Sequence, residues 1–180
     1  ILNGNYTVGT APSDFLNIAD AIEALKNCGV SGPVTFNLKS GVHQGQWVIP
    51  DIPGTSTTNT VTFQSLSKDA ASTVILNQSS TSDKHTVKFN QTKNIVFKHL
   101  TIKSNNPNKG YIIMFDGNNE NLLFDSCIVQ VPGNGYSTAG FYVDGSNPDK
   151  NITISNCVIN GGYYGMYFRG LSSNLLKNME

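Results

Sequence analysis

Charged residues are scarce in this chain of 180 residues. They make up 13% of the sequence, against about a quarter in a typical soluble domain. The 12 Lys and Arg residues are balanced by 12 Asp and Glu residues, so the formal net charge is zero. A nucleic-acid or anionic-membrane partner would need a basic stripe, which this sequence lacks. We therefore expect no nucleic-acid partner.

Cysteines and long apolar runs are also few. The three cysteines, Cys28, Cys127 and Cys157, are an odd and widely spaced set, so they do not indicate a disulfide scaffold. No Cys-x-x-Cys motif or Cys/His cluster with the spacing of a zinc site is present. We therefore expect no metal and no cofactor. No apolar run approaches the roughly 20 residues that a membrane span requires, so we expect no membrane-spanning segment.

What the chain does contain is a short recurring pattern of alternating large apolar residues. It reads Val34-Thr35-Phe36-Asn37, Val61-Thr62-Phe63-Gln64, Val87-Lys88-Phe89-Asn90, Ile113-Met114-Phe115-Asp116, Phe141-Tyr142-Val143-Asp144 and Met166-Tyr167-Phe168-Arg169. Alternation indicates strands. The positions equivalent to Phe36 recur with a nearly constant period of about 26 residues, and a regular period of this length indicates a repeat architecture. We predict that Phe63, Phe89 and Phe115 stack in one interior column.

Each later period carries two further strand-like runs joined by a two-residue polar corner. The runs are Asn94-Ile95-Val96-Phe97 and Leu100-Thr101-Ile102, Asn121-Leu122-Leu123-Phe124 and Cys127-Ile128-Val129, and Asn151-Ile152-Thr153-Ile154 and Cys157-Val158-Ile159. The pattern therefore predicts three short strands per coil. An Asn recurs at 94, 121, 151 and 174, and Asn tolerates the left-handed backbone conformation of a corner. We interpret these residues as a corner ladder.

One helix is predicted, over about residues 17–28. Asn17 suits the N-cap, the apolar residues Ile18, Ala21, Ile22 and Leu25 share one face, and Gly29 suits the C-terminal stop. A helix at this position would cover the first coil of a repeat stack. We predict a single domain over 1–180, with an N-terminal cap over 1–33 and coils over 34–180.

Three strands per coil, together with this period, predict an all-β, right-handed parallel β-helix of about five to six coils with an N-terminal capping helix. The chain resembles the pectin-lyase-like superfamily in its leading helix, in Val34-Thr35-Phe36-Asn37-Leu38-Lys39-Ser40-Gly41-Val42 and in its Asn-Ile-x-Ile-x-Asn-Cys-x-Ile coil phrase. Its opening resembles the N-terminal cap of pectin methylesterases and of β-helical domains in large bacterial surface proteins. The resemblance implies a secreted or cell-surface bacterial protein. It leaves function open, because this fold carries lyases, hydrolases, esterases and non-enzymatic adhesins.

The last residues begin a coil that they do not complete. Ser173-Asn174-Leu175-Leu176 has the pattern of another second strand, and little of the sequence follows it. We expect the chain to be a fragment of a longer one, or a second chain to cover this edge. Leu175 and Leu176 are expected on apolar surface at that edge.

A candidate polysaccharide site lies on the predicted outer face of the last coils. Met114, Tyr142 and Tyr167 form one outward column, and Asp116, Asp144 and Arg169 form the next. Tyrosine rings suit sugar rings, and Asp and Arg can bond sugar hydroxyls or uronate carboxylates. Gly140 and Gly165 are expected on the same face, where they would leave the strands accessible. If the site is catalytic, Arg169 should keep the adjacent Asp144 ionised, and Asp116 beside that like-charged Asp144 is the candidate proton donor.

Other readings of these residues remain open. Asp116-Gly117 and Asp144-Gly145 are also ordinary turn dipeptides. The pectin-methylesterase phrases Gln-Asp-Thr and Asp-Phe-Ile-Phe-Gly and the polygalacturonase phrase Asn-Thr-Asp are absent, as is a pectate-lyase-like Arg arrangement. The favoured function is a non-catalytic module that binds glycan or acts as a spacer. The alternatives are a polysaccharide lyase, hydrolase or esterase, and an adhesin with a protein partner.

The remaining reactive residue types are interpreted as structural. His43, His85 and His99 are far apart and have no metal-ligand neighbour at a useful spacing. Cys127 and Cys157 occupy the same inward position in consecutive coils, which Leu100 shares, so we predict stacked buried thiols. Their parallel side chains disfavour a disulfide.

Overall fold

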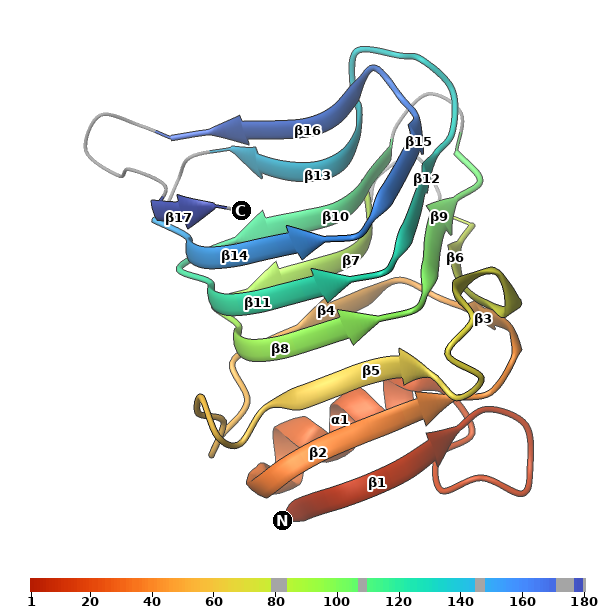
Figure 1. Ribbon diagram of the computed structural model, residues 1–180, viewed down its shortest axis with the longest axis vertical. Helices are drawn as coiled ribbons and strands as arrows, with labels where there is room; N and C mark the ends of the chain where they lie inside the picture. The colour runs from red at the N-terminus through yellow and green to blue at the C-terminus, as the bar shows by residue number, and fades with distance from the viewer. Residues whose placement is uncertain (79–83, 107–109, 145–147, 171–176, 180) are drawn as a thin grey trace.

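The chain forms a parallel β-solenoid in which three sheets wind around one interior (Figure 1). The computed structural model describes residues 1–78, 84–106, 110–144, 148–170 and 177–179. Residues 144 and 177–179 are described by their backbone alone. Every pair of neighbouring strands in the described residues is parallel. The predicted repeat fold, with about six turns, is therefore confirmed. The predicted residues Leu175 and Leu176 lie outside the described residues.

Three sheets share the strands, and each full coil contributes one strand to each sheet. Sheet A holds β1 (Leu2–Val8), β2 (Val30–Leu38), β5 (Val61–Ser65), β8 (Lys93–Lys98), β11 (Glu120–Asp125), β14 (Lys150–Ser155) and β17 (Lys177–Met179). Sheet B holds β3 (Gly41–Gln44), β6 (Thr73–Asn77), β9 (Thr101–Ser104), β12 (Ile128–Val131) and β15 (Val158–Gly161). Sheet C holds β4 (Trp47–Ile49), β7 (His85–Asn90), β10 (Gly110–Asp116), β13 (Thr138–Asp144) and β16 (Tyr164–Arg169). A 3-10 turn, η1 (Ala70–Ser72), precedes β6.

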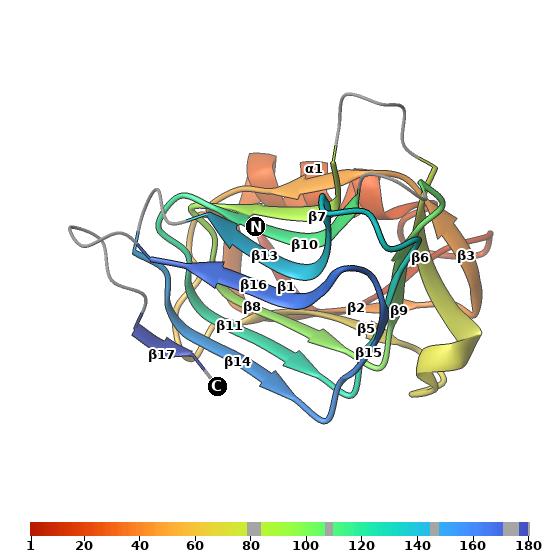
Figure 2. The same cartoon turned by 90° about the horizontal axis from the view of Figure 1, so that it is seen from above.

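The predicted helix is present as α1 (Ile18–Cys28). The Asn17 side chain accepts a hydrogen bond of 2.9 Å from the backbone N–H of Asp20, which satisfies one free donor of the first turn. Gly29 follows the helix with φ of 63°, a value that favours glycine. Ile22 and residues of β4 line one groove, so α1 lies beside the first strand of sheet C, as Figure 2 also shows.

The recurring pattern does not form one column, which corrects the sequence-based prediction. Phe63 stacks on Phe36 and packs 5.4 Å from Phe97 in sheet A, whereas Phe89 stacks on Phe115 in sheet C. Likewise, Thr62 pairs with Thr35 of β2 and Val96 of β8, and not with Lys88, which holds the equivalent position in the recurring pattern. The recurring pattern therefore changes from sheet A to sheet C between these two residues.

The physical cause of the change of sheet is one long coil. Val61 pairs with Ile95, and Ile95 pairs in turn with Leu122, so each pair spans one coil. The chain from Val61 to Ile95 is clearly longer than the chain from Ile95 to Leu122. The turn that holds η1 and the residues between β6 and β7 lengthen this coil. A step of one regular period from β5 therefore stops one strand short, in sheet C. Spacing alone could not reveal this, because strands of sheets A and C carry the same alternation.

Phenylalanine rings from sheets A and C meet in the core. Phe89 lies edge to face with Phe97 and Phe124, at centroid distances of 5.5 Å for both. The three rings are almost completely buried. Burial of aromatic rings contributes much of the stability of such a core, with a further gain from edge-to-face geometry.

The corner where each coil enters sheet A carries hydrogen-bonded asparagines. Asn121 donates from Nδ2 to Oδ1 of Asn94 at 3.1 Å, and Asn151 donates to Oδ1 of Asn121 at 2.9 Å. All three have φ between 54° and 58°, in the left-handed region. Asn suits this position because its short polar side chain tolerates that conformation and bonds its counterpart in the next coil.

Candidate functional site

The structure brings together the three residues of the predicted stacking column. Met114 pairs with Tyr142, and Tyr142 pairs with Tyr167, on the neighbouring strands β10, β13 and β16 of sheet C. All three side chains are half-buried. They therefore lie in one row across the outer face of the last three strands of this sheet.

The ring of Tyr142 is covered on both faces. Tyr111 stacks on one side at a centroid distance of 3.7 Å, and Tyr167 stacks on the other at 5.2 Å, with interplanar angles of 8° and 11°. A sugar ring therefore cannot lie against either face of Tyr142. This tyrosine can present only its edge and its hydroxyl to a ligand.

Asp116 has a basic neighbour that the sequence-based prediction did not include. Nζ of Lys88 lies 2.6 Å from Oδ2 of Asp116. Asp144 pairs through its backbone with Arg169, and its side chain is outside the described residues. Arg169 is exposed at the end of β16.

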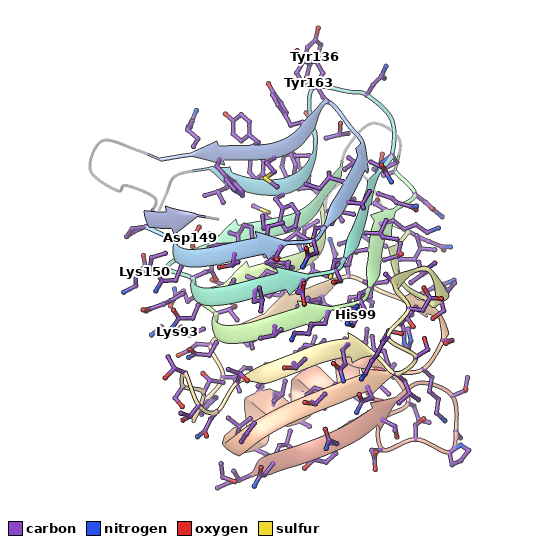
Figure 3. The ribbon with its side chains drawn as sticks, viewed as in Figure 1. Lys93, His99, Tyr136, Asp149, Lys150 and Tyr163 are labelled. Carbon is purple, nitrogen blue, oxygen red and sulfur yellow. The ribbon has the colours of Figure 1, made fainter. Side chains whose placement is uncertain are left out.

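A buried carboxyl that sequence reasoning missed is Asp149, which precedes β14. Only 1% of this residue is exposed. Burial raises the pKa of the Asp149 carboxyl to about 6, although hydrogen bonds from Asn119 oppose the shift. The backbone N–H and Nδ2 of Asn119 each donate to Oδ1 of Asp149 at 2.8 Å, and Asn119 accepts from the backbone N–H of Thr92. Three coils are thereby joined at the corner between sheets C and A, where Figure 3 labels Asp149.

A pocket of about 410 Å³ lies outside this corner. Its lining includes Lys93, Glu120 and Lys150, which occupy paired positions on β8, β11 and β14. Nζ of Lys150 lies 3.2 Å from Oε1 of Glu120. Since Asp149 is buried beneath the surface and faces Asn119, we assign it a structural role in the corner and no contact with ligands.

The row of tyrosines continues beyond sheet C onto an exposed corner. Tyr167 contacts Tyr164 at 5.1 Å, Tyr164 contacts Tyr163 at 4.7 Å, and Tyr163 contacts Tyr136 at 4.6 Å between ring centroids. The exposed fractions of Tyr164, Tyr163 and Tyr136 are 36%, 48% and 81%. Figure 3 shows Tyr136 and Tyr163 projecting together at one end of the stack. Six of the seven tyrosines in the sequence thus form one connected run.

Hydrogen bonds hold the two loops that carry the exposed rings. The hydroxyl of Thr138 accepts from the backbone N–H of Tyr163 at 2.9 Å and donates to the carbonyl of Gly135 at 2.7 Å. The backbone N–H of Gly162 donates to the carbonyl of Gly133 at 3.1 Å. The loop between β12 and β13 is therefore tied to the turn between β15 and β16. We call this tied pair, with Tyr136, Tyr163 and Tyr164, the tyrosine corner.

Glycine is required in the turn that presents Tyr163. Gly162 has φ of 78°, and a Cβ there would lie 2.7 Å from Cγ1 of Val131.

Gly140 does not open the outer face of sheet C, which corrects the prediction from sequence. A Cβ at Gly140 would point inward, 2.8 Å from Cγ2 of Ile159, and a Cβ at Gly165 would lie 3.9 Å from the same atom.

The sequence held a signal for the tyrosine corner that strand periodicity did not use. Tyr136, Tyr163 and Tyr164 follow glycines in turn-forming stretches, Pro-Gly-Asn-Gly-Tyr and Gly-Gly-Tyr-Tyr-Gly. Large aromatic residues within turns have little interior to occupy, so they mark exposed aromatic surface.

The two inward cysteines are in contact, as predicted for stacked thiols, and no cysteine is in a disulfide in the described residues. A hydrogen bond from the Cys127 thiol lowers the pKa of Cys157 to about 7, although burial opposes the shift. That same hydrogen bond, together with burial, raises the pKa of Cys127. Cys127 is buried and Cys157 is half-buried. The pair is therefore asymmetric in both ionisation and access.

The histidines lie apart from one another. Nε2 of His43 bonds the carbonyl of Lys39 at 2.8 Å, and the carbonyl of His85 accepts from Nδ2 of Asn77 at 2.7 Å. His99 adopts φ of 52° at the corner between sheets A and B. Among the described residues, no three or more His, Cys, Asp or Glu side chains are grouped so that they could hold a metal ion.

None of the described helices has the length and apolar character needed to cross a bilayer.

Comparison with solved structures places the chain in the pectin-lyase-like fold. No family model and no curated protein sequence matches it. The pectin methylesterase from Aspergillus niger aligns with a TM-score of 0.64 and 18% identity over 97% of this chain. A pectin methylesterase mutant in complex with a hexasaccharide aligns with a TM-score of 0.65 and 16% identity over 98% of the chain. This chain spans 63% and 60% of the two. At these identities the likeness establishes the fold alone.

Proposed function

We propose that this chain is a non-catalytic β-helix module of a secreted or cell-surface protein that binds a polysaccharide. The single observation that carries the proposal is the tyrosine corner, where three contacting rings are exposed to solvent. Exposed aromatic surface of this kind marks a binding site more often than a structural feature. Tyrosine combines an apolar face, which suits the C–H surface of a sugar ring, with a hydroxyl that can bond sugar hydroxyls.

The organisation of the tyrosine corner also favours binding. Thr138 ties the loop that carries Tyr136 to the turn that carries Tyr163, so the rings are positioned before a ligand arrives. A pre-organised surface loses less conformational entropy when it binds. Tyr167 and Met114 would extend the contact surface along sheet C, and Arg169 would lie at its far end.

The fold is compatible with a long sugar chain. Two of the similar pectin methylesterase structures contain hexasaccharides, which supports glycan binding by a solenoid of this shape. The non-catalytic assignment has separate support. Asp116 is engaged by Lys88, Asp149 is buried, and the enzyme phrases are absent from the sequence.

The test compares wild type with the double variant Tyr136→Ala/Tyr163→Ala in affinity electrophoresis against a panel of soluble polysaccharides. We expect wild type to be retarded by at least one polysaccharide and the double variant to lose about tenfold in affinity, or about 1.4 kcal/mol. Leu66→Ala, which removes an exposed apolar side chain elsewhere, is the control and should bind as wild type does. No retardation by any polysaccharide would refute the proposal. Release of methanol or oligosaccharide products would refute the non-catalytic assignment.

A further inference from the structure

We infer that the sugar chain bound at the tyrosine corner is uncharged, and this inference rests on the glycan-binding function proposed above. The segments that build the corner contain no charged residue. From 126 to 143, and again from 151 to 168, the sequence has no Asp, Glu, Lys, Arg or His. The two uncharged segments are therefore the ones that carry the exposed rings of Tyr136, Tyr163 and Tyr164.

The polar groups around the rings are amides and hydroxyls. Asn134 belongs to the loop that carries Tyr136, and Asn160 belongs to β15, directly before the turn that carries Tyr163. Gln130 pairs with Asn160 on the outer side of sheet B. All three side chains are exposed. Each amide offers both donors and an acceptor, which match the hydroxyls of a neutral sugar.

Three of the described cations lie at the margins of this surface. Arg169 is at the opposite end of β16 from Tyr164, a separation of about 16 Å along a strand. Lys103 pairs with Gln130 from β9, on the side away from β15. Lys84 lies over the ring of Tyr111, with Nζ 5.8 Å from the ring centroid. No cation among the described residues therefore projects from the tyrosine corner itself.

Charge complementarity consequently favours a neutral ligand. A polyuronate carries a carboxylate on every sugar unit, and these carboxylates would lose water against aromatic rings without gaining a cationic partner. The hydroxyls of a neutral chain lose less on desolvation and can bond Asn134 and Asn160. Sites that bind anionic groups instead use Arg and Lys at the point of contact. The absence of such residues discriminates against the charged form.

The decisive comparison uses one polymer backbone in two charge states. Fully methyl-esterified homogalacturonan is uncharged, and its saponified form is the corresponding polyuronate. Neutral β-glucan, xylan, mannan and galactan complete the panel. We expect retardation by at least one uncharged polymer. The affinity for that uncharged polymer should exceed the affinity for the saponified polymer by about tenfold or more, and it should change little between about 0.05 and 0.5 M salt.

A gain-of-charge variant provides a second readout. Asn134→Lys/Asn160→Lys should bind the saponified polymer more tightly than wild type does, and salt should weaken that added binding. Asn134→Ser/Asn160→Ser, which leaves the corner neutral, is the matched control and should not gain polyuronate binding. Circular dichroism and thermal melts would verify that each variant folds.

The outcomes separate the inference from the proposed function. In one outcome, the saponified polymer binds as tightly as the uncharged polymers, and Tyr136→Ala/Tyr163→Ala loses this binding. That result would support the glycan site and overturn the inference about charge. Binding of no polysaccharide would overturn both. Binding of uncharged polymers that is unchanged in the tyrosine variant would also overturn both, because the site would lie elsewhere.

Discussion

The backbone N–H of Tyr163 donates a hydrogen bond of 2.9 Å to the hydroxyl of Thr138, one coil away. Thr138 is fully buried, and its hydroxyl also donates to the carbonyl of Gly135. One hydroxyl therefore links the two loops that carry Tyr136 and Tyr163. This contact and the hydrogen bond from the N–H of Gly162 to the carbonyl of Gly133 together hold the two loops that orient the exposed rings.

Replacing Thr138 should loosen the tyrosine corner without removing a ring. In Thr138→Val, the side chain keeps its shape but leaves the N–H of Tyr163 without its acceptor, at a cost of about 1–3 kcal/mol. We expect weaker polysaccharide binding and faster amide hydrogen exchange at Tyr163. Thr138→Ser keeps the hydroxyl and should retain most of the affinity. Equal affinities of wild type and the Val variant would show that the contact does not position the rings.

The core between sheets A and C should be sensitive to loss of a phenylalanine. Phe89 is fully buried and contacts Phe97, Phe115 and Phe124. Phe89→Ala should lower the free energy of unfolding by about 3–5 kcal/mol. Lys88→Ala, one residue away on the outer face, should cost within about 1 kcal/mol because its ion pair is partly exposed. Urea melts would measure both, and similar losses would contradict the assignment of inner and outer faces.

Asp149 should make stability depend on pH. Its folded-state pKa of about 6 lies above the usual 3.8, so the folded chain favours the protonated carboxyl. Its contribution is fully present below pH 3.8 and is lost as the pH rises through 6. The total loss is up to about 3 kcal/mol.

Asp149→Asn provides the test, because the amide keeps an oxygen that can accept from Asn119 without a charge. The difference in unfolding free energy between variant and wild type should grow in favour of the variant from pH 4 to 7 and then level off. A difference independent of pH would show that Asp149 ionises as easily as an exposed aspartate.

The two stacked thiols should differ in reactivity. Cys157 is half-buried and has its pKa lowered to about 7 by the hydrogen bond from Cys127, whereas Cys127 is buried and has a raised pKa. In a Cys28→Ser background, which removes the exposed thiol, iodoacetamide should label Cys157 first, with a rate that rises between pH 6 and 8. Peptide mass spectrometry would read each site, with the urea-unfolded chain as the reference for full labelling. Faster labelling of Cys127 would contradict the assignment.

Much of the fold could be predicted because it depends on local patterns. The alternation around Phe89 and Phe115 indicated strands whose period gave the number of coils. Asn17 and Gly29 marked the ends of α1, because caps are local interactions between a side chain and the nearest backbone groups. The row of Met114, Tyr142 and Tyr167 was also predicted, since the last coils have nearly equal lengths.

Predictions that crossed the long coil were wrong. Phe63 and Phe89 have the same local pattern, yet they belong to different sheets. Which strand pairs with which is decided by the geometry of a complete coil, including a turn whose length the alternation does not report. A different limit hid the partner of Asp116. Lys88 lies on the preceding strand of sheet C, and close contact across strands depends on side-chain direction, which the strand pattern does not report.

The sequence by itself determined the architecture of this protein, because alternating apolar residues repeated at near-constant spacing have few ways to bury their apolar faces other than a stack of coils. Only the tertiary structure decided the candidate site. The rings of Tyr136 and Tyr163 are separated by a whole coil of the chain and meet because two loops lie at the same corner of successive coils. Strand patterns report on the residues that the core selects, whereas a surface site is assembled from residues that the core leaves unconstrained.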